Sequence, residues 1–331
     1  MDNEGYTRTN ATENPLMYNW TIVDLSESPT YESRKPQIAP SLPAPPRPAL
    51  FLPVYCDGSS QTSDLTDPVT VPGWPTPIYH RGARILRATI ASLLAAGLAS
   101  ATEVVVSGCS AGGLSTYLHA DKWSSALAPH GARVVALADS GFFLDYNDSS
   151  SLTFPQRMQW TYDTLNISAS LYPECLAQYP GAQGWRCFMA QYAAPHIRTP
   201  LFEIQSYFDS YQISAIGGLN ASNRTAVNAY GALLEAAVAE SQAANPRIGG
   251  AVDACNHHCS RALWYTMSMG RFDGANVSQG GAFAQWYAEQ GQGQRVWEQE
   301  ATYPCASCCA GMGSSSSGCD AGSAASSGTF H

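Results

Sequence analysis

The sequence predicts an α/β fold with a mainly parallel central sheet flanked by helices. Residues 104–106, 133–138 and 201–209 are short runs with many apolar residues, as strands buried on both faces are. Residues 81–98 instead place apolar side chains three and four positions apart, which is the spacing of one helical face. Strands that alternate with helices favour parallel pairing, because a crossover helix returns the chain to the same edge of the sheet.

The N-terminal part contains two further expected strands. We expect one short strand within residues 14–23 and another at residues 51–55. Between them, residues 26–48 are rich in proline and serine, and we expect an exposed insertion because proline removes backbone donors. The glycine- and serine-rich residues 310–331 are expected to be a disordered tail. Residues 1–309 are therefore predicted to form a single domain.

The stretch at residues 104–118 has the sequence form of a nucleophile elbow. The valine run leads directly into Gly-Cys-Ser-Ala-Gly, centred on Ser110, and a segment with helical character follows. Small neighbours permit a tight turn that exposes the Ser110 hydroxyl and leaves the Ala111 N–H at a helix N-terminus, where it can donate to an oxyanion. The alternative interpretation is a glycine-rich turn with an incidental serine. Ser110, Asp139 and Asp209 all fall at the carboxyl ends of predicted strands, where parallel sheets bind ligands.

The chain also offers the two partners that a catalytic serine requires. A serine hydroxyl needs a general base within hydrogen-bond reach and a carboxylate that orients the base. In α/β-hydrolases these residues follow in the order serine, acid, histidine. Ser110 is followed by Asp209 and then by His257 and His258, so the predicted fold is α/β-hydrolase-like. On the residues alone, both histidines stay open as the base, and Asp253 is a second candidate acid.

Ten cysteines indicate an oxidising compartment. Cys305 and Cys308 have the local spacing of half a zinc site, but no second pair completes four ligands, so we favour disulfides. Cys109 is predicted to be packed or disulfide-bonded and not a thiol nucleophile. Asn-x-Ser/Thr sequons also favour a secretory route; they begin at Asn10, Asn19, Asn147, Asn166, Asn220, Asn223 and Asn276.

Charge and hydropathy exclude some partners. The chain has 17 basic and 26 acidic residues, a formal net charge of −9, and no basic cluster that would bind phosphates. The alanine-rich residues 88–101 are too short for a membrane span and contain Thr and Ser. We therefore predict no nucleic-acid partner and no stable membrane insertion, and we expect a monomer. The polar residues 1–5 lack the apolar segment of a signal peptide, and we expect an incomplete N-terminus.

Taken together, these motifs resemble the plant pectin acetylesterase family, to which the animal carboxylesterase Notum is related. The matching segments run in the family's order from Asn14 to Cys309 and cover most of the chain. They are Asn-Pro-x-x-Tyr-Asn-Trp from Asn14, Tyr-Cys-Asp-Gly from Tyr55, Arg-Gly-Ala-Arg-Ile from Arg81, Ser-Gly-Cys-Ser-Ala-Gly-Gly from Ser107, Ala-Asp-Ser-Gly-Phe-Phe-Leu-Asp from Ala138, Thr-Pro-Leu-Phe from Thr199, Asp-Ser-Tyr-Gln-Ile from Asp209, Cys-x-x-His-Cys from Cys255 and Tyr-Pro-Cys from Tyr303.

The resemblance implies roles for three residues. It implies Ser110 as nucleophile, Asp209 as the orienting acid and His258, in preference to His257, as the base. It further implies a secreted cell-wall esterase that removes O-acetyl groups from a polysaccharide such as pectin through an acyl-enzyme. No cofactor or metal is implied. The alternative implied by Notum is removal of a lipid from a protein, and the sequence separates the two poorly because pocket depth decides acyl length.

The sequence departs from the family pattern at its beginning. Family members carry a Gly-Gly-Gly-Trp-Cys-type segment upstream of Asn14, whose backbone amides complete the oxyanion hole, and residues 1–13 do not match it. Of the two sources of oxyanion-hole donors, the sequence then shows only one, the Ala111 N–H. Loss of one oxyanion donor lowers kcat by about 10²–10³. We therefore expect either a fragment of a longer protein or a divergent member with weak or no activity, whose alternative role is glycan binding.

Overall fold

The computed structural model describes most of the chain. The described residues are 10–12, 14, 16–17, 20–24, 49–52, 57–70, 73, 75–147, 152–260, 263–272, 275–290, 295–299, 302–305 and 308–309. The predicted insertion at residues 26–48 and the predicted tail at residues 310–331 lie outside these ranges. Those two assignments, and the boundary of a single domain at residue 309, stay predictions.

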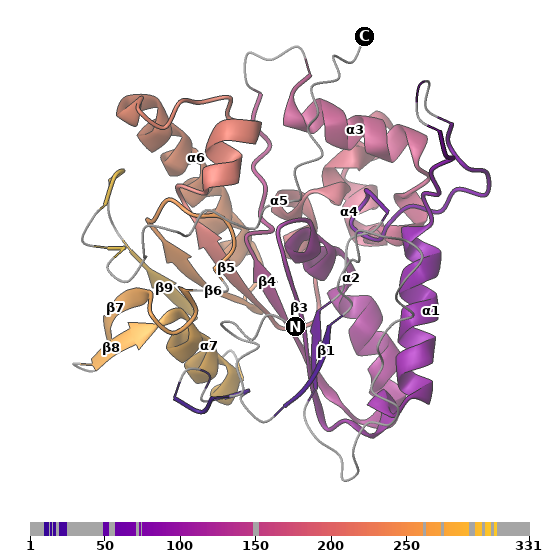
Figure 1. Cartoon of the computed structure of the whole chain (residues 1–331), viewed down its shortest axis with the longest axis horizontal. Coiled ribbons are helices and arrows are strands. Elements are labelled where there is room, and N and C mark those ends of the chain that lie inside the picture. The colour runs from indigo at the N-terminus through magenta and orange to yellow at the C-terminus, as the bar shows by residue number, and fades with distance from the viewer. Residues whose placement is uncertain are drawn as a thin grey trace.

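A parallel sheet of seven strands crosses the described part of the molecule (Figure 1). The strands lie in the order β1-β2-β3-β4-β5-β6-β9, and every neighbouring pair is parallel. Their bounds are β1 Thr21–Asp24, β2 Ala49–Leu52, β3 Glu103–Cys109, β4 Arg133–Asp139, β5 Leu201–Ser206, β6 Ile248–Asp253 and β9 Val296–Glu298. A small antiparallel pair is formed by β7 Ser268–Phe272 and β8 Ala275–Ser278. The predicted α/β class with a mainly parallel sheet is confirmed.

Helices cover both faces of this sheet. The α-helices of the described residues are α1 Gly82–Ala95, α2 Ala111–Leu127, α3 Phe154–Thr164, α4 Pro173–Gln178, α5 Ala190–Ala193, α6 Arg224–Ala244 and α7 Gln279–Ala288. Side chains of α1, α2 and α6 pack on one face, and those of α7 pack on the other. The sheet is thus the middle layer of three.

Alternate residues of the central strands pack against the helices on opposite faces of the sheet. In β3, Val104 and Val106 pack in one cluster with Trp123 of α2. Val105, which points to the opposite face, packs in another cluster with Phe283 of α7. A strand buried on both faces needs apolar side chains at every position, because successive residues alternate between the faces. This requirement explains the continuous valine run before Ser110.

The predicted elements form close to their expected positions. The helix expected at residues 81–98 is α1, and the chain leaves it just before Gly97, whose φ is 118°. The strand expected at residues 201–209 is shorter and stops at Ser206, because the Phe208 N–H turns back to donate to Ser206 Oγ at 3.0 Å. This early stop releases Asp209 from the sheet.

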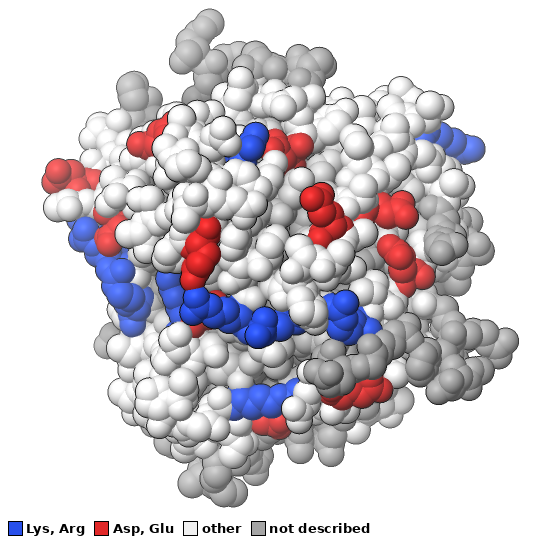
Figure 2. Space-filling model, turned by 180° about the vertical axis from the view of Figure 1, so that it is seen from behind, with Lys and Arg blue, Asp and Glu red and all other residues white. Residues whose placement is uncertain are grey.

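Charged side chains are sparse on the back of the molecule. There the Lys and Arg side chains gather in a narrow band, with Asp and Glu scattered beside them and large uncharged areas around (Figure 2). This sparse charge agrees with a chain in which only 13% of residues are charged. Within the described ranges, no helix combines the length and the apolar character that crossing a bilayer requires.

Candidate active site

Ser110 occupies a tight turn between β3 and α2. Its backbone has φ 58° and ψ −122°, a conformation that costs a residue with a side chain about 1–3 kcal/mol. Two backbone hydrogen bonds hold the turn. The Ser110 N–H donates to Asp139 O, and the Leu114 N–H donates to Ser110 O, each at 2.9 Å. The sharp turn leaves Ser110 only partly buried at the end of β3.

Glycines allow the backbone segments around this turn to approach each other. A Cβ added at Gly108 would lie 2.5 Å from the carbonyl oxygen of Gly112. A Cβ added at Gly113 would lie 2.4 Å from the carbonyl oxygen of Asp139. Both distances are shorter than any Cβ tolerates, so side chains at these positions would force α2 away from the strand ends. The small residues that predicted an elbow are required by its packing.

The structure brings Ser110, His258 and Asp209 into one chain of hydrogen bonds. Ser110 Oγ lies 2.8 Å from His258 Nε2, and His258 Nδ1 lies 2.8 Å from Asp209 Oδ2. With Nδ1–H donating to the carboxylate, the Nε2 lone pair faces the hydroxyl, which is the tautomer that can accept its proton. The side chain of His258 is 14% exposed and that of Asp209 is fully buried. The arrangement can activate a hydroxyl toward an incoming ester.

Buried hydrogen bonds orient the Asp209 carboxylate. Its Oδ1 accepts from the Gln212 N–H at 3.0 Å, and its Oδ2 also accepts from Gln205 Nε2 at 3.4 Å. Gln212 begins a short π-helix, Gln212–Ile216. The carboxylate therefore has donors on both oxygens and is held in one orientation toward His258.

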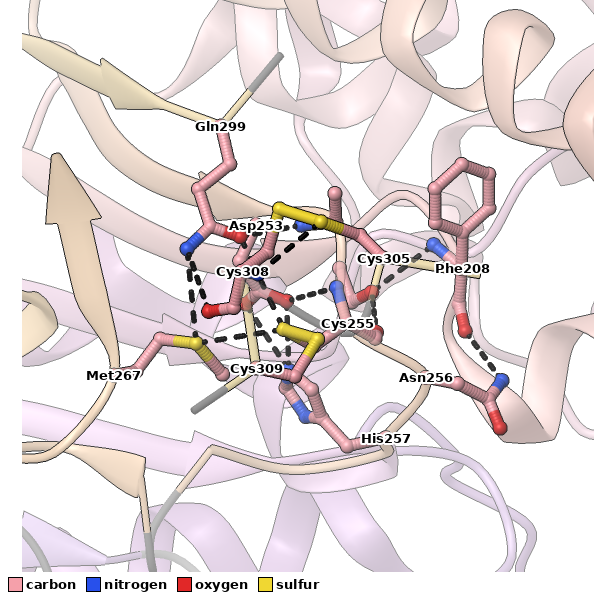
Figure 3. The surroundings of a disulfide bond; sticks show 12 residues. Phe208, Asp253, Cys255, Asn256, His257, Met267, Gln299, Cys305, Cys308 and Cys309 are labelled. Atoms are coloured by element: carbon pink, nitrogen blue, oxygen red, sulfur yellow. Dashed lines mark hydrogen bonds and ion pairs between the residues drawn. A yellow bond between two sulfur atoms is a disulfide. The ribbon is translucent and has the colours of Figure 1, made fainter. Parts of the chain in front are cut away.

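Two disulfides hold the loop that carries His258. Cys109, directly before Ser110, is bonded to Cys259, directly after His258. Cys255 is bonded to Cys309, beside a third disulfide between Cys305 and Cys308 (Figure 3). The prediction of disulfides in place of a zinc site at Cys305 and Cys308, and of a bonded Cys109, is confirmed. The covalent link between the turn and the loop keeps the hydroxyl and the imidazole together.

His257 pairs with Asp253, the last residue of β6 (Figure 3). Its Nε2 lies 3.0 Å from each carboxylate oxygen of Asp253. Burial alone would lower the pKa of His257, but the Asp253 carboxylate and its hydrogen bond raise that pKa to about 9. The raised pKa favours the protonated form of His257, and among the described residues the hydrogen bonds of its imidazole go to Asp253 and not to Ser110. Asp253, the second candidate acid, contacts His257 and not His258 among the contacts of the described residues.

Asp139 is a site residue to which the sequence assigned no role. It is fully buried at the end of β4, and both of its carboxylate oxygens accept from the Ser260 N–H at 2.9–3.0 Å. Burial raises its pKa, while the bonds from Ser260 and Ser140 lower it. Ser140 Oγ in turn accepts from the Cys259 N–H at 3.0 Å. Asp139 therefore fastens the histidine loop to the sheet, and only its place at a strand end could have suggested this.

Ala111 lies at the N-terminus of α2, next to Ser110. As the first residue of the helix, its N–H is among the donors that have no acceptor within the helix. The partial positive charge of the helix N-terminus adds to its ability to stabilise an oxyanion. The predicted donor is therefore adjacent to the hydroxyl that would form the tetrahedral intermediate.

Comparison with known proteins shows which family this chain resembles. A model of the pectinacetylesterase family matches residues 52–310. Pectin acetylesterase 11 of Arabidopsis thaliana is 30% identical over 264 residues, which cover 73% of this chain and 65% of the relative. The palmitoleoyl-protein carboxylesterase NOTUM of Mus musculus is 30% identical over 149 residues, 40% of this chain and 28% of the relative. The alignment with the Arabidopsis relative thus spans slightly less than two thirds of that protein's length.

A solved structure has the same fold. The crystal structure of the Wnt deacylase Notum from Drosophila matches with a TM-score of 0.61 and 25% sequence identity. The match covers 74% of this chain and 69% of the Notum chain. The α/β-hydrolase-like fold expected from the elbow and from the order of Ser110, Asp209 and His258 is confirmed.

Proposed function

The chain belongs to the pectinacetylesterase family, and from this premise we propose that it is a serine carboxylesterase that removes O-acetyl groups from a cell-wall polysaccharide such as pectin. The observation that carries the proposal is the hydrogen-bond chain from Ser110 through His258 to Asp209. In the proposed site Ser110 is the nucleophile, His258 the general base, Asp209 the orienting acid and Ala111 an oxyanion donor. An extracellular location suits the four disulfides among the described residues, since disulfides persist in oxidising compartments.

The reaction proceeds through an acetyl-enzyme. Ser110 Oγ attacks the ester carbonyl carbon while its proton passes to His258 Nε2, and the Ala111 N–H donates to the oxygen that becomes negative. The carbon–oxygen bond to the sugar then breaks, and His258 returns the proton to the sugar oxygen. Water attacks the acetyl group of Ser110 by the same route, so that acetate leaves and the serine is restored. The hydrogen bond from His258 Nδ1 to Asp209 orients the imidazole and stabilises the imidazolium in both halves.

The acetyl group is favoured over a lipid acyl group by the relatives. The family model and the Arabidopsis relatives carry the name pectin acetylesterase, and the alignment with pectin acetylesterase 11 covers 73% of this chain. The alignment with mouse NOTUM, whose name refers to a palmitoleoyl-protein substrate, covers 40%. These longer matches support a polysaccharide substrate.

The first test is acetate release from acetylated pectin by protein expressed through a secretory pathway. We expect release by the parent protein and a loss of at least about 10³-fold in Ser110→Ala, because the acyl acceptor is removed. Ser107→Ala is the matched control. Ser107 lies on β3, three residues before Ser110, is buried, and its Oγ has no hydrogen-bond partner among the described residues. Full activity of Ser110→Ala, or binding of acetylated pectin without acetate release by the parent, would contradict the proposal.

A further inference from the structure

A cavity of about 680 Å³ lies between α1 and α2, two helices on the same face of the sheet (Figure 1). Its volume is within the range of about 300–1,000 Å³ that is typical of pockets for small organic ligands. Ser110, Asp209 and His258 do not line it. Each residue of an α-helix adds about 1.5 Å, so the lining residue Lys122 lies about 16 Å beyond Ala111 along α2. The cavity is therefore separate from the candidate active site.

The walls of this cavity are largely aliphatic. On α1, Leu86, Ile90 and Leu94 follow each other at four-residue spacing and form one stripe along the helix. Leu118 and Ala126 line the cavity from α2. Ile90 and Leu94 are only half-buried, so they keep apolar surface in contact with solvent. An alkyl chain laid along the stripe would remove that surface from water, which is favourable.

One cation lines the cavity without a carboxylate partner. Lys122 Nζ donates to Ser170 O at 2.6 Å and lies 3.0 Å from His119 Nδ1. His119 is neutral, because burial and the charge of Lys122 lower its pKa well below the ordinary value, and its Nε2 donates to Ser60 O. Both acceptors of the ammonium are thus uncharged, and one of its three N–H donors remains for a ligand. Lys122 takes part in no ion pair with the residues that the structure describes.

The two carboxylates that line the cavity are occupied by donors of the protein itself. Asp121 Oδ1 accepts from the Thr199 N–H at 2.8 Å and from the Thr199 hydroxyl at 2.7 Å. Glu174, in the first turn of α4, pairs with Arg198. Neither carboxylate therefore neutralises Lys122.

A second positive charge lies at the same cavity. Arg87 lines it from α1 and shares the Asp64 carboxylate with Arg84, so this group of three carries a net positive charge. Burial and the charge of Arg87 lower the pKa of Lys122 to about 8. An anion bound here would offset both effects, because it favours the charged form of the lysine.

We propose that the cavity between α1 and α2 binds an aliphatic carboxylic acid, whose carboxylate pairs with Lys122 and whose alkyl chain lies along Leu86, Ile90 and Leu94. Aliphatic walls with one unpaired cation fit an alkyl chain that carries a single anionic head. The site is an accessory one. It goes beyond the proposed esterase reaction, since Ser110 takes no part in it.

The first test compares binding of decanoate with that of 1-decanol, which has the same chain and no charge. Isothermal titration calorimetry is used, with both ligands below the concentrations at which they aggregate. We expect the parent protein to bind decanoate about tenfold more tightly, and Lys122→Gln to abolish this preference. Arg224→Gln is the control and keeps the preference, because it removes the same charge from an exposed residue of α6 outside the cavity.

A second measurement locates the anion on the parent protein, so it does not depend on the folding of a Lys122 variant. The sequence contains two lysines, Lys35 and Lys122. An isotope label at lysine Cε therefore gives two resonances, and Lys35→Arg identifies that of Lys122. We expect decanoate to raise the pKa of Lys122 from about 8 toward its ordinary value of 10.5, and 1-decanol to leave it unchanged.

The position of the alkyl chain is tested on α1. Ile90→Ser is expected to weaken binding of both decanoate and 1-decanol about fivefold, because apolar wall is lost. Ile85→Ser is the matched control and keeps both affinities, since Ile85 is 44% exposed on the same helix and does not line the cavity.

Three results would overturn the inference. They are a preference for decanoate that survives Lys122→Gln, a Lys122 resonance whose pKa decanoate leaves unchanged, and equal affinities of the Ile90→Ser and Ile85→Ser proteins. Decanoate bound only at Ser110 would give the first two of these results. Loss of acetate release from acetylated pectin would bear on the esterase and leave this site unaffected.

Discussion

His257 and His258 are neighbours in the chain, yet their imidazoles belong to two different Asp–His pairs. His257 shares one nitrogen between both oxygens of Asp253, and its side chain is 2% exposed. His258 forms a hydrogen bond with Asp209 through Nδ1 and another with Ser110 through Nε2. One loop, held by the Cys255–Cys309 and Cys109–Cys259 disulfides, thus carries a buried Asp–His pair and a candidate catalytic pair side by side.

A structural histidine and a general base differ here in what their second ring nitrogen contacts. Both imidazoles have a carboxylate partner, so an Asp–His contact does not identify a general base. The Asp253 carboxylate raises the pKa of His257 to about 9, and the hydrogen bonds of this imidazole among the described residues go to Asp253 and not to the serine. His258 instead has a nitrogen 2.8 Å from a hydroxyl, at a partly exposed place that a substrate can reach. Its position relative to Ser110 is the distinguishing feature.

The largest expected effect comes from exchanging each histidine for glutamine. In His258→Gln we expect kcat for an acetyl ester to fall by about 10⁴-fold or more, because the base is lost. In His257→Gln we expect kcat of the folded protein to stay within about tenfold, since the serine keeps its base. Steady-state kinetics on protein shown to be folded by circular dichroism would check this. Equal losses in the two variants would contradict the assignment of His258 as the base and His257 as a structural residue.

We expect the Asp209 carboxylate to control kcat and the Asp253 carboxylate to control stability. Asp209→Asn should lower kcat by about 10⁴-fold, because the amide no longer fixes the tautomer of His258. Asp253→Asn should act on stability, since it leaves the buried His257 cation without its partner, and we expect the free energy of unfolding to fall by about 3–5 kcal/mol. Urea unfolding and kcat, measured on both variants, separate these effects. A stable Asp253→Asn protein with 10⁴-fold lower kcat would reverse the assignment.

A smaller effect is expected in the pH dependence of stability. The pKa of His257 is higher in the folded state, about 9, than its ordinary value of 6.5, so the folded protein binds the proton more tightly. The resulting stabilisation, at most about 3 kcal/mol, is fully present below pH 6.5 and is lost as the pH rises through 9. Urea unfolding at pH 6 and pH 9.5 would measure it, and His257→Gln should flatten this part of the profile. An unchanged slope in the variant would show that another group is responsible.

Local features of the fold could be predicted from the sequence. The valine run at residues 104–106 and the small residues around Ser110 predict a buried strand and a tight turn, because periodicity and glycine content act within a few residues. The strand at residues 201–209 was predicted too long, because its end depends on Ser206 Oγ accepting from the Phe208 N–H. Such a side-chain bond leaves no periodic signal.

Contacts between distant segments were decided by the tertiary structure. On its residues alone the sequence left His257 and His258 equally open as the base, and only the resemblance favoured His258. The hydrogen bond between Ser110 and His258 spans 148 residues, and the disulfide from Cys109 to Cys259 spans 150. The hydrogen bonds from the Ser260 N–H to the Asp139 carboxylate also join distant segments, which are 121 residues apart.

The parallel α/β class, the elbow and a set of candidate acids and bases could be predicted from the order of the residues. The tertiary structure alone decided which imidazole faces the serine, which carboxylate holds each histidine and which cysteines pair. The reason is physical. Secondary structure follows from side-chain periodicity and backbone freedom over a few residues, whereas a pairing across the sheet depends on how β3, β4, β5 and β6 align in register and end at one edge.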